Sequence, residues 1–269
     1  MIKQVLLAFQ FLTIVPVKVA GEITGKEVAG ASAFFPLAGA FQGLVTSLSA
    51  LLLLNIAPPD ITAGFALLLL ILSNGGFDLD GLADTFDALA VKSSGDAERD
   101  RAKRLLVMKD SSTGAMGAIA LIIAILLKFV LMGRLLSDIP FFLAGPVLFL
   151  MPVFSKWITV PVMYHARSAK KDGLGRIFIE GIGLEGVIIS TALTAALFLL
   201  ASLPQLTGIS LTSGIGQCVF LLTAFYLFGL LAIKFLTKRF GGLTGDHFGA
   251  LTEISEILFL SGAYLWLRH

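Results

Sequence analysis

The segment Ala115–Leu136, AMGAIALIIAILLKFVLMGRLL, decides the class of fold. A helix needs about 20 mostly apolar residues to cross a hydrocarbon layer of about 30 Å. This segment is long enough, and Lys128 and Arg134 are the only charged residues within it. It therefore predicts a membrane-spanning helix, and with it an integral membrane protein.

Further segments along the chain have the same apolar character. Four of them qualify as readily, Phe34–Ile56, Ile61–Phe77, Phe141–Met163 and Leu184–Leu203, and Ile215–Leu236 is a sixth span. Leu251–Leu267 is weaker, because Glu253 and Glu256 interrupt it. We predict an all-α, polytopic helical bundle with about six to seven transmembrane helices. The N-terminal run Val5–Val15 is too short to span, so we expect an interfacial or re-entrant helix that Pro16 stops; a signal-peptide core is the alternative.

The composition agrees with one integral membrane domain over residues 1–269. Hydrophobic residues make up 57% and charged residues 14%, against roughly 45–50% and about 25% in soluble globular domains. A soluble domain, a disordered chain and a disulfide scaffold are therefore excluded, and Cys218 has no second cysteine to pair with. The net charge of +2 gives no reason to expect a nucleic-acid partner.

Lysine and arginine collect in alternate connections between the predicted spans. The basic connections are 78–114, 164–183 and 237–250, whereas 57–60, 137–140 and 204–214 contain neither residue. If each segment crosses once, the basic connections share one face, which the positive-inside rule assigns to the cytoplasm. We therefore expect a multi-pass protein of the cytoplasmic (inner) membrane, with the functional loops 78–114 and 237–250 on the cytoplasmic face.

Three aspartates follow the second span at helical spacing. If the helix continues, Asp80, Asp84 and Asp87 stand at i, i+4 and i+7, within an arc of roughly 60°. Three like charges on one stripe repel one another, and hard oxygen ligands near a membrane surface suit Mg²⁺ bound to substrate phosphates. The alternative is a set of solvated carboxylates where a helix leaves the bilayer. Asp78 points elsewhere on the same helix.

A second cluster opens the last span. The run 241–250, GGLTGDHFGA, contains Gly245 and Asp246, and its glycines permit close approach of the backbone to a ligand. Asp246, Glu253 and Glu256 stand at i, i+7 and i+10 and favour one helix face. Glutamates inside an apolar span are costly and usually face a cavity or a partner. Snorkelling to the interface is the alternative.

A third cluster, 108–117, precedes the span at Ala115 and contains Lys109, Asp110 and Ser111. Asp110 or a following hydroxyl is a candidate cap for that helix. The helix N-terminus beside Lys109 is equally a natural site for an anion. The residues alone leave both interpretations open.

Two lysines lie within apolar spans, where an unpaired ammonium group costs a few kcal/mol. Lys128 has two alternatives, an internal ion pair with Glu253 or Glu256, or contact with substrate. Lys156, beside Ser155, is nearer the cytoplasmic end and is the better candidate for phosphate binding.

Three ordered motifs resemble those of the cobalamin synthase family. Residues 75–87 resemble its GGFxxDGLADTxD signature, 108–117 its MxDSxxGxxG element, and 241–250 its GGxTGDxxGA element. Glu253 and Glu256 follow at the family's spacing, and the likeness covers essentially the whole chain. Two departures are Asp78, where the family often has His, and Lys156, which replaces a more usual Arg. Lysine keeps the charge but loses bidentate binding of phosphate.

The resemblance implies a Mg²⁺-dependent transferase that joins adenosylcobinamide-GDP to α-ribazole or its 5′-phosphate. The products would be adenosylcobalamin, or its 5′-phosphate, and GMP. We expect the catalytic and metal-binding residues to be Asp80, Asp84, Asp87 and Asp246. We expect the substrate-binding residues to be Lys109, Asp110, Ser111, Lys128, Ser155, Lys156, Gly245, Glu253 and Glu256. The lipid bilayer is an expected partner, and the sequence leaves open a homo-oligomer or association with other cobalamin-assembly enzymes.

Two other functions are weighed against this one. A CDP-alcohol phosphotransferase-like enzyme also has an Asp-rich Mg²⁺ site, but its motif requires Arg where Asp84 follows Ala83. An ion-coupled transporter would place carboxylates near the midplane and often carries an internal repeat. The strongest acidic stripe lies instead at a helix end, and no repeat is evident.

Overall fold

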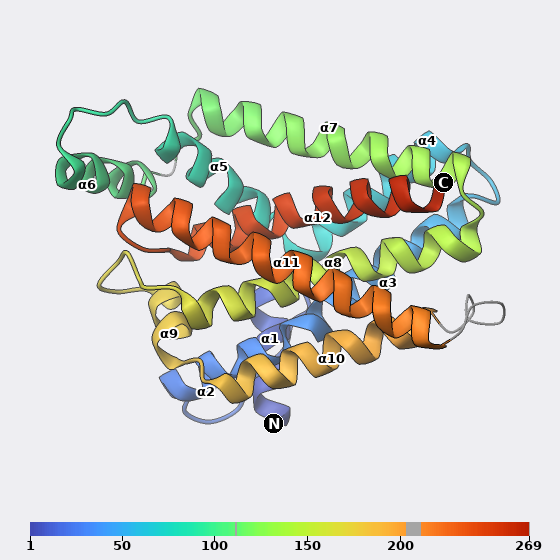
Figure 1. The fold of residues 1–269 in the computed structure, drawn as a ribbon, viewed down its shortest axis with the longest axis horizontal. Helices are drawn as coiled ribbons and strands as arrows, with labels where there is room; N and C mark the ends of the chain where they lie inside the picture. Colours follow the sequence, from blue (N-terminus) through green and yellow to red (C-terminus); the bar gives the residue numbers. More distant parts are fainter. Residues whose placement is uncertain (111, 203–210, 269) are drawn as a thin grey trace.

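The computed structural model describes residues 1–110, 112–202 and 211–268, and this part of the chain is helical (Figure 1). Its helices are α1 (Ile2–Leu12), α2 (Gly25–Ala31), η1 (Ser32–Phe34), α3 (Phe35–Leu53), α4 (Pro59–Asn74), α5 (Phe77–Leu89), α6 (Ala97–Val107), α7 (Ala115–Asp138), α8 (Phe141–His165), α9 (Leu174–Gly181), α10 (Leu184–Ser202), α11 (Leu211–Phe240) and α12 (Gly245–Arg268). The described residues contain six helices long and apolar enough to cross a membrane, and seven if the bent pair α4–α5 is one span. The predicted polytopic membrane bundle is therefore confirmed.

The long helices run side by side along the long axis of the molecule (Figure 1). The basic segments gather at one end, where α6, α9 and the turn between α11 and α12 lie. The turns between α3 and α4 and between α7 and α8, which carry no lysine or arginine, lie at the other end. The connections rich in lysine and arginine thus lie at one end of the bundle, and these two connections without either residue lie at the other.

Helix α8 forms the centre of the bundle and is buried along most of its length. It packs most extensively against α3, where Gly39 and Gly43 face its backbone. A Cβ atom on either glycine would overlap the carbonyl oxygen of Pro152 or Phe149. Small residues at such a contact let two helices approach closely enough for van der Waals packing to hold them in a membrane.

The second predicted span is broken. Gly75 and Gly76 both adopt left-handed backbone angles, with φ of +67° and +76°, a conformation that glycine reaches without steric cost. Helix α4 therefore ends at Asn74, and α5 begins at Phe77 after a bend of 86°. The acidic stripe lies on this separate helix, which packs against α12 and α7.

The N-terminal helix α1 has 11 residues and falls short of a span, as the sequence predicted. It ends at Leu12, ahead of Pro16, because Thr13 turns to extended backbone with φ of −138° and ψ of 159°. The backbone N–H of Ile14 then donates to the carbonyl oxygen of Ser73, at 2.9 Å. The N-terminal segment thereby satisfies a carbonyl group at the end of α4, beside the break.

Candidate functional site

The break between α4 and α5 is fixed by the side chain of Asn74. Its Oδ1 accepts from the backbone N–H of Gly76 at 2.8 Å, and its Nδ2 donates to Oδ2 of Asp78 at 2.7 Å. Oδ2 of Asp78 also accepts from the ammonium group of Lys156 on α8. The start of the acidic helix is therefore held both to the helix before it and to the centre of the bundle.

Helices α5 and α12 touch through their backbones at two glycines. A Cβ on Gly81 would lie 2.5 Å from the carbonyl oxygen of Asp246, and a Cβ on Gly249 would lie 2.9 Å from that of Asp78. Only glycine permits this approach, since real Cβ atoms essentially never come that close. The contact brings the GGLTGD loop beside the acidic stripe. A single site that contains Asp246 and the aspartates of α5 requires this proximity.

The carboxylates of α5 and α12 act on one another. Asp80 is exposed, while Asp84 and Asp246 are half-buried. Burial has the largest influence on the Asp84 carboxylate; the charges of Asp80, Asp246 and Asp87 also act on it, and the charge of Lys170 opposes them. Asp80 and Asp84 lie on either side of Gly81 in the sequence, and the backbone of Gly81 contacts that of Asp246.

Asp87, the fourth, has a different neighbour. Its carboxylate accepts from the backbone N–H groups of Gly114 and Gly117, at 2.6 Å and 2.7 Å, and so caps the first turn of α7. The expectation that Asp110 caps this helix is wrong, because its Oδ1 instead accepts from the backbone N–H and the hydroxyl of Ser112. The cap comes from a preceding helix because the Asp87 side chain reaches N–H groups that have no partner within α7.

The other residues of the third cluster lie at the surface. Lys109 and Asp110 are exposed between α6 and α7, and Ser111 lies outside the described residues. Gly245 is the first residue of α12, and its backbone nitrogen would be 2.6 Å from a Cβ on Gly175. That contact joins α12 to the start of α9.

The two buried lysines within the spans, Lys128 and Lys156, are both paired with acidic residues. The ammonium group of Lys128 lies 2.7 Å from Glu253 and 2.9 Å from Glu256, and all three side chains are almost completely buried. The hydroxyl of Ser155 donates to Oε1 of Glu256 at 3.3 Å. The internal ion pair, one of the two alternatives for Lys128, is therefore present. Lys156 is likewise buried against Asp78.

Lys170 was not singled out by the sequence, where it is one of several basic residues between α8 and α12. Its ammonium group lies 3.2 Å from Oδ2 of Asp246, which also accepts from the hydroxyl of Thr244 at 3.1 Å. Residues 167–169 and 243 form a short parallel bridge, with hydrogen bonds from Ala169 N–H to Leu243 and from Leu243 N–H to Arg167. No local feature of the sequence distinguishes Lys170 from the adjacent Lys171.

The oxygen donors suit Mg²⁺ chemically, although they form no closed cage. Within the described residues, no three acidic, histidine or cysteine side chains are grouped closely enough to hold a metal ion. Mg²⁺ usually binds proteins through one or two carboxylates and takes its other oxygens from water and substrate phosphates. Asp246 with one carboxylate of α5, Asp84 or Asp80, fits such an incomplete site, in which other oxygens would complete the shell of the ion.

Comparison with known proteins places the chain in a family. Residues 4–264 match the CobS family, described as cobalamin-5-phosphate synthase. The chain is 37% identical to an adenosylcobinamide-GDP ribazoletransferase of Thermodesulfovibrio yellowstonii over 100% of both chains. It is 34% identical to one of Desulfitobacterium hafniense over 96% of this chain and 95% of the relative, and 33% identical to one of Escherichia coli over 84% of each. No solved structure matches the chain. On this full-length similarity and the three ordered motifs, the chain belongs to the CobS family of cobalamin-5-phosphate synthases.

Proposed function

We propose that this chain is an adenosylcobinamide-GDP ribazoletransferase whose active site lies between α5 and α12 at the basic end of the bundle. Its similarity to proteins of that name along the full chain carries the proposal. The apposition of Asp84 on α5 and Asp246 on α12 supports it, because two of the family-like motifs meet there. Phosphoryl transfer depends mainly on charge neutralisation and positioning, which such a site provides.

The reaction replaces a pyrophosphate linkage with a phosphodiester. The ribose 3′-hydroxyl of α-ribazole, or of its 5′-phosphate, attacks the phosphorus joined to the aminopropanol arm of the corrinoid. A new O–P bond forms at this phosphorus, and the bond between the same phosphorus and the bridging oxygen of the pyrophosphate breaks, so that GMP leaves with the bridging oxygen. The hydroxyl proton passes to a nearby carboxylate or to water. We assign this role to Asp84 or to the exposed Asp80.

The aspartates would also hold Mg²⁺ against the pyrophosphate. Asp84, Asp246 and Asp80 supply the hard oxygen ligands that Mg²⁺ prefers, and the ion would neutralise charge on the phosphates. Asp87 makes a smaller contribution, because both of its oxygens are hydrogen-bonded to the backbone of α7. Lys109 is exposed between α6 and α7, and its charge is available to a substrate phosphate.

The buried charges hold this arrangement in place. Asp78 with Lys156 joins α5 to α8, and Lys128 with Glu253 and Glu256 joins α7 to α12. Breaking a buried pair leaves an uncompensated charge and costs about 3–5 kcal/mol. These five residues therefore serve to position Asp84 and Asp246. We assign the substrate contacts to residues nearer the surface.

The site faces the cytoplasm in this proposal. The basic connections share its end of the bundle, and the positive-inside rule assigns that end to the cytoplasmic side of the inner membrane. Nucleotide substrates are available there, and the product GMP is released there. The apolar surface of the spanning helices keeps the enzyme in the bilayer.

One assay tests the function. Detergent-purified protein is incubated with adenosylcobinamide-GDP, α-ribazole and Mg²⁺, and GMP and cobamide are followed together by liquid chromatography. We expect the two products in equal amounts, and neither after addition of EDTA. GMP without cobamide would indicate hydrolysis instead of transfer. Neither product, from folded protein, would reject the proposal and lead to assays of CDP-alcohol transfer and ion transport.

A further inference from the structure

Lys170 is carried to the acidic cluster by two segments that are far apart in the sequence. Residues 167–169 pair with Leu243 through backbone hydrogen bonds of 2.8 Å and 2.7 Å. Gly242 makes this pairing possible, since a Cβ there would lie 2.5 Å from the carbonyl oxygen of Arg167. The hydroxyl of Ser168 donates to the carbonyl oxygen of Lys170 at 2.8 Å and fixes the backbone at that residue.

The charge of Lys170 is directed at the residues that we assign to the reaction. Its ammonium group pairs with Asp246 and also acts on Asp84. Among residues 1–110, 112–202 and 211–268, it is the one lysine or arginine that forms an ion pair with Asp80, Asp84, Asp87 or Asp246. Asp246 is the second residue of α12. A helix N-terminus favours anions and disfavours an ammonium group, so this lysine is not placed there by the helix.

The pair is also weak enough to be exchanged. The side chains of Lys170 and Asp246 are 24% and 29% exposed, unlike the buried pairs at Lys128 and Lys156. Partly exposed ion pairs contribute little to stability, and the flexible stem of lysine lets its ammonium group move between partners. A substrate that carries a pyrophosphate offers a stronger partner than one carboxylate.

We propose that Lys170 is a phosphate-binding residue that pairs with Asp246 in the free protein and with the pyrophosphate of the bound substrate. In the first state it balances the carboxylates of α5 and α12. In the second state it leaves Asp246 available to a divalent cation and neutralises charge on the departing GMP. This inference rests on the proposed function, and it assigns to Lys170 a role that differs from that of the buried lysines.

The substitution Lys170→Met tests it through two measurements with opposite expected signs. Binding of Mn²⁺, which is visible by electron paramagnetic resonance and substitutes for Mg²⁺, should become about two- to fivefold tighter in the substrate-free protein, because the competing ammonium group is gone. The kcat/KM for adenosylcobinamide-GDP should fall about 100-fold, because a charge that stabilises the phosphates is lost. Lys170→Arg keeps the charge and should lose less than Lys170→Met.

Lys171→Met is the matched control, since it removes the same charge from the adjacent, exposed residue. It should change neither measurement by more than about twofold. If Lys170→Met weakens Mn²⁺ binding as well as turnover, the lysine is structural and the proposal is overturned. If Lys170→Met changes neither Mn²⁺ binding nor kcat/KM, the proposal is also overturned. In that case, turnover by the wild-type protein would still support the proposed function. Wild-type protein that binds Mn²⁺ but makes neither product would reject the function, and the Mn²⁺ comparison would still test the pair.

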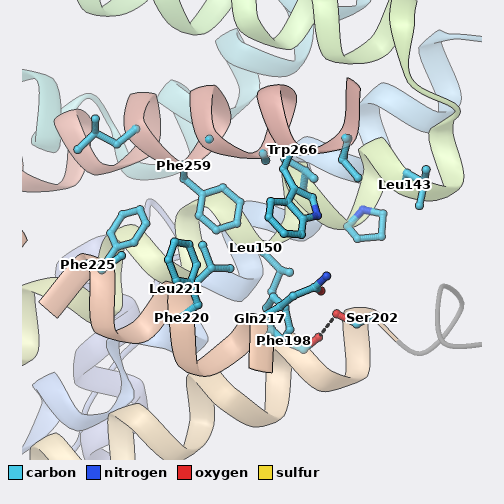
Figure 2. Close-up of a pocket in the computed structure, with 17 residues that line it drawn as sticks. Leu143, Leu150, Phe198, Ser202, Gln217, Phe220, Leu221, Phe225, Phe259 and Trp266 are labelled. Atoms are coloured by element: carbon cyan, nitrogen blue, oxygen red, sulfur yellow. Dashed lines mark hydrogen bonds between the residues drawn. The ribbon is translucent and has the colours of Figure 1, made fainter. Parts of the chain in front are cut away.

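An apolar cavity lies in another part of the bundle. It encloses about 310 Å³ between α8, α10, α11 and α12 and is lined mainly by apolar side chains, among them Phe225, Phe259 and Trp266 (Figure 2). Nothing in the structure identifies an occupant, so it carries no proposal.

Discussion

The carboxylate of Asp87 on α5 accepts a hydrogen bond of 2.7 Å from the backbone N–H of Gly117 on α7, thirty residues later in the chain. The second oxygen accepts from Gly114 in the same turn. One member of the acidic stripe thus fixes the start of a spanning helix, while its neighbours Asp80 and Asp84 remain free for ligands. The three aspartates look equivalent in the sequence, but Asp87 has a structural role and Asp80 and Asp84 are the ones we assign to the reaction.

Asp87→Ala should lower the stability of the protein. Loss of a helix cap costs about 0.5–2 kcal/mol, and Asp87→Asn should recover part of the loss because it keeps one acceptor oxygen. Thermal unfolding in detergent measures the effect. The Mg²⁺ concentration for half-maximal activity should stay unchanged in the Asn variant, and a large increase would show that Asp87 is instead a metal ligand.

Asp84→Asn should abolish turnover without loss of stability. The side chain keeps its shape, and removal of one charge relieves repulsion from Asp80 and Asp246. We expect a fall in kcat of about 100-fold or more, since a lost ligand or base is not replaced. Asp60→Asn, an exposed residue at the opposite end of the bundle, is the matched control. Normal turnover of Asp84→Asn at saturating Mg²⁺ would contradict the assignment.

Gly81→Ala should separate α5 from α12. The new Cβ would lie 2.5 Å from the carbonyl oxygen of Asp246, so one of the backbones must shift, and overpacking of this kind typically costs about 1–3 kcal/mol. Activity should fall further than stability, because the displaced helix carries Asp84. Gly262→Ala on α12 is the control, since no atom lies within 4 Å of the added carbon. Equal effects of the two substitutions would argue against the close contact.

Ile14→Pro tests the link between the N-terminal segment and the broken span. Proline has no N–H, so the hydrogen bond to Ser73 is lost. The preceding Thr13 is already extended, which is the conformation that a following proline requires. We expect lower activity and about 1–3 kcal/mol less stability, as for an unpaired backbone carbonyl. Ile14→Ala keeps the N–H and should retain activity; equal loss in both would assign the effect to the side chain.

The sequence by itself determined the membrane-spanning helices, because about 20 consecutive apolar residues have few other uses. It also determined which connections share an end of the bundle, through their lysines and arginines, and it identified the family through three motifs. The spacing of Asp80, Asp84 and Asp87 was sufficient to place them on one helix, since helical periodicity is a local property.

The tertiary structure alone decided how the charges are paired. Lys128 with Glu256 and Lys156 with Asp78 join residues 128 and 78 positions apart, and Lys170 reaches Asp246 across 76 positions. No local pattern distinguishes Lys170 from Lys171, or Asp87 from Asp84. Lys170 is selected by the backbone bridge between residues 167–169 and Leu243. Asp87 is selected by its hydrogen bonds to the start of α7. Both contacts join segments that are far apart in the sequence, so only the folded chain shows them.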